Sequence, residues 1–310
     1  MDRDQGLRTV STTLAATDPS GGPSRSASRF LYRHPRARLA GLLAAPLLWL
    51  VVLYLGSLLV MIVAAFWSTD SFTGALIKEP TLDNFKTLLT NPVYRTVAVR
   101  TLGIAVSVTL IDIVLAVPLA FMAAKVVRSR RVRYAIVIAV TMPLWAGYLV
   151  KGYAMQTMFI NNGVIDWMLA PFGLKGPGLG LLATILSLAY LWLPYMVLPV
   201  YAGLERLPDS LLEASADLGA SAGHTFRAVV LPLLVPSLVA GSIFTFSLTL
   251  GDYIMVKIVG GTTQMWSNII YDNVGVANNL PLAAAAAFFP IIVIVCYLLA
   301  VRRTGALENL

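Results

Sequence analysis

The sequence predicts an all-α integral membrane protein with six transmembrane helices. Of its 310 residues, 58% are hydrophobic and only 12% are charged, whereas an ordinary soluble domain carries about 25% charged residues. The polar residues are confined to short stretches between long apolar runs. Each run holds the roughly 20 residues that a helix needs to cross the hydrocarbon core of a bilayer. The expected spans are 39–66, 101–124, 134–158, 179–204, 228–250 and 282–301.

The length of the first run indicates a retained membrane helix and not a signal peptide. It extends over 28 residues without a charge, whereas the apolar part of a signal peptide has about 7–15 residues. The preceding residues 1–38 are rich in Ser, Thr, Arg, Gly and Pro, a composition typical of a disordered segment. We therefore expect a disordered tail over 1–38 and one transmembrane domain over 39–303.

Every expected span contains a proline. Within a membrane bundle, neighbouring helices can satisfy the carbonyl groups that a proline leaves free. Two interpretations stay open at this stage: the prolines kink the helices to shape a pathway, or the bundle tolerates them. The residues are Pro46, Pro118, Pro143, Pro194, Pro232 and Pro290.

The distribution of Lys and Arg predicts the orientation, because short loops rich in these residues stay in the cytoplasm. One side would carry the tail, the links 125–133 and 205–227, and the C-terminus, with sixteen of the 23 basic residues. The other side would carry Lys78, Lys86, Arg95, Arg100, Lys175 and Lys257. Both termini are therefore expected in the cytoplasm. The net charge of +8 follows from these flanking residues and does not indicate nucleic-acid binding.

The link 205–227 between the fourth and fifth spans is too polar for the membrane and too long for a tight turn. Ser210 and Glu213 have the spacing of a capping box, which predicts a helix over about 211–218. Gly219 would end that helix, and Gly223 would allow a second bend. Spacing alone also fits an ordinary amphipathic connector. One face of the helix would hold Leu211, Ala214, Ser215 and Leu218, and another Glu213 and Asp217.

The same link resembles the EAA motif of the permease subunits of ABC importers. That motif has Glu-Ala-Ala, three residues, Gly, nine residues and Ile-x-Leu-Pro, and the intervals recur here. The matching residues are Glu213, Ala214, Ser215, Gly219, Val229, Leu231 and Pro232. Ser215 replaces the second alanine and Val229 replaces the isoleucine.

Other segments are similar to polyamine-type permeases, so that the resemblance covers about residues 40–303. They are Asn84–Leu89 with Pro92, Pro143–Ala154 with a basic residue at Lys151, and Gly251-Asp252-Tyr253 with Gly260-Gly261. Arg100 stands where asparagine is common, and Val256 where proline is usual.

The resemblance implies the fold of a type I importer permease in the bacterial cytoplasmic membrane. It implies as partners a second permease subunit in a heterodimer, two copies of an ABC ATPase and an extracytoplasmic solute-binding protein. Membrane lipid is the further partner expected of the apolar spans. ATP and Mg would be bound by the ATPase. The cytoplasmic link would dock on that ATPase through Glu213, Ala214, Ser215, Asp217, Leu218, Gly219 and Ala220. The implied substrate is spermidine or putrescine, and an opine, iron, sulfate or a sugar stay as alternatives.

Ionisable residues at membrane depth are costly and therefore indicate function. Asp112, Lys151, Asp252 and Lys257 lie in or next to the expected spans. Asp252 beside Tyr253 is the leading substrate contact, since a carboxylate next to an aromatic ring attracts an ammonium group. The expected substrate path also includes Tyr148, Trp145 and Lys151.

Motifs for chemistry within this chain are missing from the sequence. It has no G-x-x-x-x-G-K-[ST] phosphate-binding loop and no G-x-S-x-G elbow. His34 and His224 lie far apart in the chain, and Cys296 is the single cysteine, so neither a metal site nor an intrachain disulfide is expected. A transporter subunit rather than an enzyme follows. The alternatives are an ion-coupled secondary carrier that uses Asp112 and Lys151, and, less favoured, a membrane-bound enzyme.

Overall fold

The computed structural model describes residues 39, 43–44, 46–70 and 73–302. The expected disordered tail, 1–38, lies outside the described residues. The chain divides into two compact units, 1–60 and 61–310. In the first unit the chain is helical from Pro46 onward, with a π-helical segment, Leu50–Leu55, leading into α3 (Gly56–Ala64). The boundary between the units falls within α3.

After the end of α3, the second unit contains the only strands in the described part of the chain. β1 (Ser68–Thr69) pairs antiparallel with β2 (Leu76–Ile77), with Ser68 opposite Ile77. This small hairpin is the exception to the expected all-helical fold. The next helix, α4 (Asp83–Thr90), leads to the first long helix of the unit.

The second expected span begins before residue 101. The helix α5 (Pro92–Phe121) continues into a π-helical segment, Met122–Val126. The Asn91 side chain accepts a hydrogen bond from the Val93 amide at 2.9 Å, and Pro92 occupies the first helical position, where its missing N–H costs nothing. Capping therefore starts the helix at Pro92.

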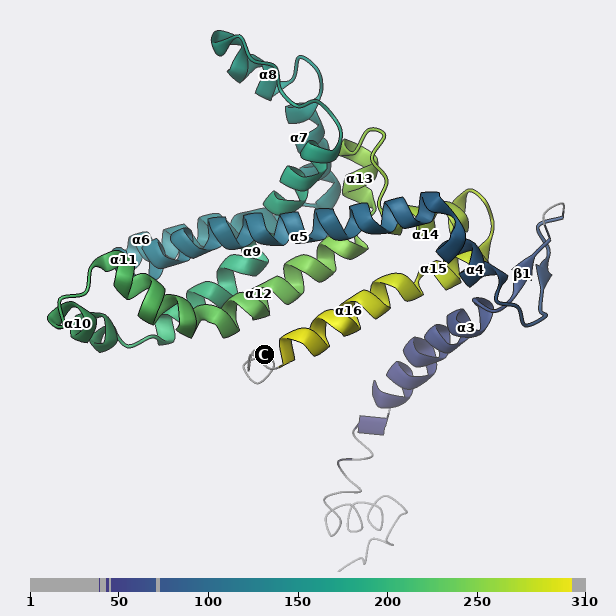
Figure 1. Cartoon of the computed structure of the whole chain (residues 1–310), viewed down its shortest axis with the longest axis horizontal. Coiled ribbons are helices and arrows are strands. Elements are labelled where there is room, and N and C mark those ends of the chain that lie inside the picture. The colour runs from purple at the N-terminus through teal and green to yellow at the C-terminus, as the bar shows by residue number, and fades with distance from the viewer. Residues whose placement is uncertain (1–38, 40–42, 45, 71–72, 303–310) are drawn as a thin grey trace, which may run out of the picture. The chain divides into compact units, whose positions relative to one another are not determined.

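Three long helices pack together as the centre of the unit: α5, α9 (Leu181–Arg206) and α12 (Leu231–Gly251) (Figure 1). Glycines let α9 and α12 approach closely. A Cβ atom on Gly203 would lie 2.2 Å from the Ser237 Oγ, and one on Gly241 would lie 2.6 Å from the Met196 Sδ. Small residues at such crossings are typical of membrane helix pairs.

The third expected span is bent rather than straight. It comprises α6 (Arg130–Thr141), a 3₁₀ turn (Met142–Trp145) and α7 (Tyr148–Phe159), followed by α8 (Val164–Leu169). The chain bends by 98° between Arg130–Trp145 and Tyr148–Phe172. Pro143 lies in the 3₁₀ turn, and Ala146 and Gly147 have ψ values of 139° and 141°, which are not helical. In contrast, Pro118 and Pro194 lie inside continuous helices.

The C-terminal part consists of four helices, α13 (Ile254–Val259), α14 (Trp266–Gly275), α15 (Leu280–Ala286) and α16 (Phe288–Val301). Trp266 connects them to the centre, since its indole N–H donates to the Ala286 carbonyl at 2.7 Å and its amide donates to the Thr101 hydroxyl at 2.8 Å. Buried alanines of α15 pack around the indole ring.

Five helical stretches within the described residues are long and apolar enough to cross a membrane, or six if the bent pair counts as one span. The five are Pro46–Ala64, Pro92–Val126, Leu181–Arg206, Ala222–Gly251 and Leu280–Val301.

The second unit has two distinct ends. The link between α9 and α12 contains α10 (Asp209–Asp217) and α11 (Ala222–Thr225), and it lies at one end of the long helices (Figure 1). The helices α13 and α14 lie toward the other end (Figure 1). The two groups of sequence-predicted site residues therefore occupy opposite ends.

Candidate functional site

The link between α9 and α12 is fastened to the end of α5 by a lysine. The Lys125 Nζ donates to the Leu207 carbonyl and to an Asp209 carboxylate oxygen, both at 2.6 Å. The Lys125 side chain is 9% exposed. This hydrogen bond and the positive charge of Lys125 lower the pKa of Asp209. The start of α10 is thus held to a residue far away in the sequence.

The capping box expected at Ser210 and Glu213 does not form. The helix begins at Asp209, after Pro208, and among the described residues no side chain caps its first amides. Asp209 lies in the first turn, where a carboxylate interacts favourably with the helix dipole, and its ion pair with Lys125 fixes it there. The earlier start moves Ser210 from the expected capping position into the helix.

Gly219 ends α10 as expected. Its φ is +78°, in the left-handed region that favours glycine. The Ala220 amide donates to the Ser215 carbonyl at 3.1 Å, and the Gly219 amide donates to the Ala216 carbonyl at 2.8 Å. These two bonds form a Schellman motif, which turns the chain toward α11.

Ser215 joins the two short helices. It is buried, and its hydroxyl shares a 2.8 Å hydrogen bond with the hydroxyl of Thr225 in α11. An alanine at this position, as in the EAA motif, would lack that bond. Below it, Leu212 packs near the edge-to-face pair of Phe121 and Phe226, whose ring centroids are 5.9 Å apart. The inner face of the link is therefore a packed contact with α5 and the start of α12.

The outer face of the link remains accessible. Glu213, Ala214, Asp217 and Gly219 are exposed, and Leu218 is 88% exposed. Leu218 does not share the environment of Ser215, although both were expected on one face. The surface that results carries two carboxylates and one protruding leucine.

A second candidate site is a pocket of about 290 Å³ at the other end of the long helices. Eight residues line it, from α7, α9, the end of α12 and the turn into α13. They include Tyr148, Asp252 and Tyr253 among the residues expected on a substrate path. The remaining five are Trp192, Ser247, Leu248, Gly251 and Ile254.

Asp252 is the one charged group of this lining, and it is 8% exposed. Its carboxylate accepts hydrogen bonds from the Tyr148 hydroxyl and, at 2.9 Å, from the Met255 amide. The Ser267 hydroxyl donates to the backbone carbonyl of Asp252 at 2.5 Å. Burial raises the pKa of Asp252, and the hydrogen bonds from Tyr148 and the backbone oppose that rise. The Asp252 carboxyl group is therefore fixed by hydrogen bonds and largely removed from water.

A run of aromatic rings leads from the pocket along α9 to Phe244 of α12. The ring centroids are separated by 6.4 Å for Tyr148 and Trp192, 5.9 Å for Trp192 and Tyr195, and 6.4 Å for Tyr195 and Phe244. Within the described part of the chain, the buried Trp192 indole N–H has no hydrogen-bond partner. Such a run offers successive π faces to a cation.

The positive charges near the pocket are placed outside its lining. The Lys257 ammonium pairs with Asp272 and lies 4.5 Å from the Tyr271 ring centroid, and Tyr271 stacks on Tyr253 at 4.7 Å. The Lys151 Nζ lies 6.0 Å from the Tyr148 ring centroid. Lys257 thus has an acidic partner, Asp272.

Two other expected residues lie away from the pocket. Trp145 is 90% exposed in the 3₁₀ turn before α7. Asp112 is fully buried on α5, and neither of its carboxylate oxygens has a hydrogen bond among the described residues. The structure does not bring either residue to Asp252.

The sequence did not point to Lys125, Trp192, Tyr195 or Ser267. Lys125 and Asp209 are 84 positions apart, and Tyr148 and Asp252 are 104 apart. No local pattern signals such pairs. For Trp192 and Tyr195, the three-residue spacing on one helix was a usable signal.

Comparison with known proteins gives consistent matches. Residues 116–306 match the family described as "Binding-protein-dependent transport system inner membrane component". The chain is 43% identical to the inner membrane ABC transporter permease protein YdcU of Escherichia coli (strain K12), covering 91% of this chain and 95% of that protein. It is 30% identical to the spermidine/putrescine transport system permease protein PotB of the same organism, covering 84% and 95%.

Two solved structures share the fold. A chain of a bacterial alginate ABC transporter, in complex with an alginate pentasaccharide-bound periplasmic protein, aligns with a TM-score of 0.71 at 18% identity, covering 89% of this chain and 96% of that chain. A chain of the MetNI methionine ABC transporter in an inward-facing conformation aligns with a TM-score of 0.54 at 19% identity, covering 69% and 96%.

Proposed function

This chain belongs to the family of inner membrane components of binding-protein-dependent transport systems, and from that premise we propose that it imports a polyamine through the pocket around Asp252. It is an ABC importer permease, a transporter subunit and not an enzyme. Within the importer, this chain would recognise the cation and let it pass through the membrane.

The charge of the pocket carries the proposal. Its eight lining residues include one carboxylate, Asp252, and no Lys or Arg. Three of them, Tyr148, Trp192 and Tyr253, are aromatic. A desolvated carboxylate beside aromatic rings attracts an ammonium group through charge and cation–π interaction together. An anion would meet the same carboxylate and be repelled.

The names of the relatives support the same substrate class. Of the relatives described above, PotB is named for spermidine and putrescine transport. Spermidine and putrescine carry several ammonium groups on a flexible apolar chain. One ammonium would bind at Asp252, and the run from Trp192 through Tyr195 to Phe244 would receive the next.

The link between α9 and α12 is proposed as the docking surface for an ATPase. Glu213, Ala214, Asp217 and Leu218 form its outer face, Gly219 and Ala220 its turn, and Ser215 its internal hydrogen bond. Lys125 fastens α10 to α5, and α11 leads without a break into α12. A displacement of α10 by nucleotide binding and release would therefore reach both long helices.

The proposed assembly is a heterodimer of this chain with a second permease, two ATPase copies that bind ATP and Mg, and an external solute-binding protein. Both termini would lie in the cytoplasm, on the side of the link. The pocket around Asp252 would then open outward. The permease would alternate between outward and inward access because the ATPase contacts the docking surface differently in the two states.

Uptake of radiolabelled spermidine and putrescine into proteoliposomes that hold the full complex tests the substrate. Wild type should take up both with internal ATP, and Asp252→Asn should lose most uptake because the pocket loses its only charge. Asp272→Asn is the matched control, since Asp272 pairs with Lys257 outside the pocket lining. Equal loss in both variants, or full uptake by Asp252→Asn, would contradict the assignment.

A second pair of variants tests the docking surface. Glu213→Ala should abolish uptake while the pocket stays intact, whereas Glu79→Ala, an exposed acid far from the link in the sequence, should leave uptake unchanged. If binding-protein-stimulated ATP hydrolysis occurs without uptake of either polyamine by wild type, the importer stands and the substrate is wrong.

A further inference from the structure

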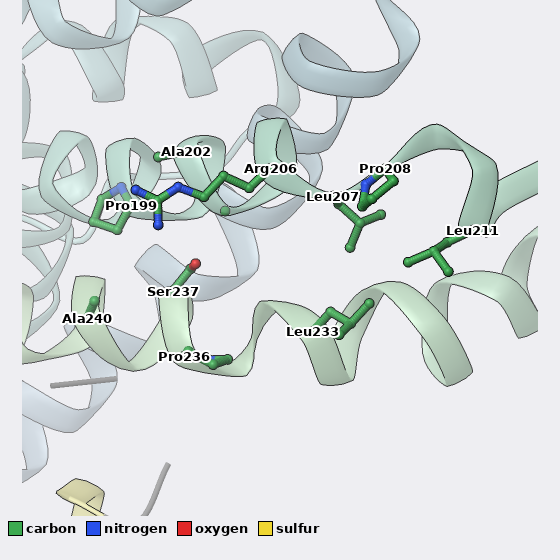
Figure 2. A pocket seen from close by; sticks show the side chains of 11 residues that line it. Pro199, Ala202, Arg206, Leu207, Pro208, Leu211, Leu233, Pro236, Ser237 and Ala240 are labelled. Atoms are coloured by element: carbon green, nitrogen blue, oxygen red, sulfur yellow. The ribbon is translucent and has the colours of Figure 1, made fainter. Parts of the chain in front are cut away.

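A groove with a volume of about 430 Å³ lies between α9 and α12, next to α10 (Figure 2). Its floor is the close contact of Gly203 with Ser237. Its walls are mostly apolar and come from α9 on one side and α12 on the other, including Pro199, Ala202, Leu233, Pro236 and Ala240.

Arg206 is the one charged residue of the groove lining. Its side chain reaches back along α9, so that the guanidinium lies near Pro199 and above Ser237 of α12 (Figure 2). Helical side chains lean toward the N-terminus of their helix. The charge is thus carried over the groove and away from the α10 end.

The neighbouring carboxylates are already engaged. Glu205 accepts a hydrogen bond from the Tyr201 hydroxyl at 2.5 Å, and Asp209 pairs with Lys125 at 2.6 Å. Within the described residues Arg206 forms no ion pair, and its guanidinium faces a groove without an acid. The groove therefore combines mostly apolar walls with one positive charge that has no acidic partner in the described part of the chain.

We propose that this groove binds an anionic phospholipid, with the phosphate on Arg206 and Ser237 and an acyl chain along Leu233, Pro236 and Ala240. Arginine forms bidentate hydrogen bonds to phosphate, and the cytoplasmic leaflet, on the proposed side of the link, is rich in anionic lipids. A neutral helix of another subunit would cover the apolar walls and leave the guanidinium without an anion.

Native mass spectrometry of the purified full complex, titrated with phosphatidylglycerol, tests the site. Arg206→Gln should weaken the tightest lipid-binding step about tenfold or more, as expected when a charged hydrogen-bond donor is lost. Arg128→Gln, which removes an exposed arginine from the link between α5 and α6, is the matched control and should bind as wild type does. Phosphatidylcholine should bind more weakly than phosphatidylglycerol to wild type.

Several results would overturn the proposal. Equal weakening by Arg206→Gln and Arg128→Gln would mean a general surface charge, and displacement of the lipid by inorganic phosphate would mean a simple anion site. Ala202→Trp fills the groove and leaves Arg206 in place, so unchanged lipid binding there would also contradict it. So would cross-linking of Ala202→Cys to the second permease, in a Cys296→Ser background, because the groove would then be a subunit interface.

Discussion

Replacement of Gly219 isolates the backbone geometry that ends α10. Its φ of +78° is left-handed, and a Cβ atom at this position would meet nothing within 4 Å. The cost of Gly219→Ala is therefore backbone strain alone, roughly 1–2 kcal/mol for an L-residue in this region. A destabilisation of this size raises the population of the locally opened turn about 5- to 30-fold.

Hydrogen–deuterium exchange of the full complex measures that opening. The reporter is the Ala220 amide, which donates to the Ser215 carbonyl at 3.1 Å. After correction for intrinsic rates, it should exchange about 5- to 30-fold faster in Gly219→Ala. Gly219→Asn should show a smaller change, because asparagine tolerates the left-handed conformation better.

Gly223→Ala is the matched control. Gly223 lies inside α11 without a positive φ, and a Cβ atom there would also meet nothing within 4 Å. Because alanine favours a helix over glycine, this variant should not speed exchange at Ala220. Equal acceleration in both variants, or none in Gly219→Ala, would refute the assignment of the turn to the left-handed glycine.

Three further predictions concern single contacts. Ser215→Ala removes the hydrogen bond to Thr225 and should destabilise the link by about 1 kcal/mol, seen as faster amide exchange in α11; an equal effect of Ser210→Ala at an exposed position would contradict this. Lys125 lowers the pKa of Asp209 in the folded protein. The ion pair between them therefore stabilises the link above the pKa of an unfolded Asp carboxyl group, and this stabilisation is lost as the pH falls through the pKa of folded Asp209. The difference between wild type and Asp209→Asn in the protection of the amides of the link from exchange should thus be constant above about pH 5 and vanish well below about pH 4. A difference that grows on acidification would contradict this. Tyr148→Phe removes the donor that orients Asp252 and should raise the KM for spermidine uptake about tenfold, whereas Tyr153→Phe at an exposed position should not.

The long helices were predictable from the sequence because lipid imposes a simple rule on composition and length. The break between α6 and α7 was not, although Pro143 and Gly147 were visible. An apolar run long enough to span a bilayer does not reveal whether it is continuous. The bend depends on the extended backbone at Ala146 and Gly147, which hydropathy does not report.

The candidate sites were predicted in part. Gly219 could be assigned from local turn chemistry, because the left-handed residue lies directly after the helix. The start of α10 was misassigned, since the ion pair with Lys125 replaces the local capping box. Asp252 was chosen from its neighbour Tyr253, yet its hydrogen-bond partners are Tyr148 and the Met255 amide. Contacts between distant segments require the packed structure.

Protection of an engineered cysteine tests most directly whether a polyamine occupies the pocket around Asp252. Ser247→Cys places a thiol in the lining, Trp145→Cys places one on the exposed turn outside it, and both are made with Cys296→Ser in the full complex. The account predicts that spermidine slows labelling of Ser247→Cys by a cationic thiol reagent and leaves Trp145→Cys unchanged, and that Asp252→Asn removes the protection. Labelling of Ser247→Cys that is indifferent to spermidine, or protection that survives Asp252→Asn, would contradict it.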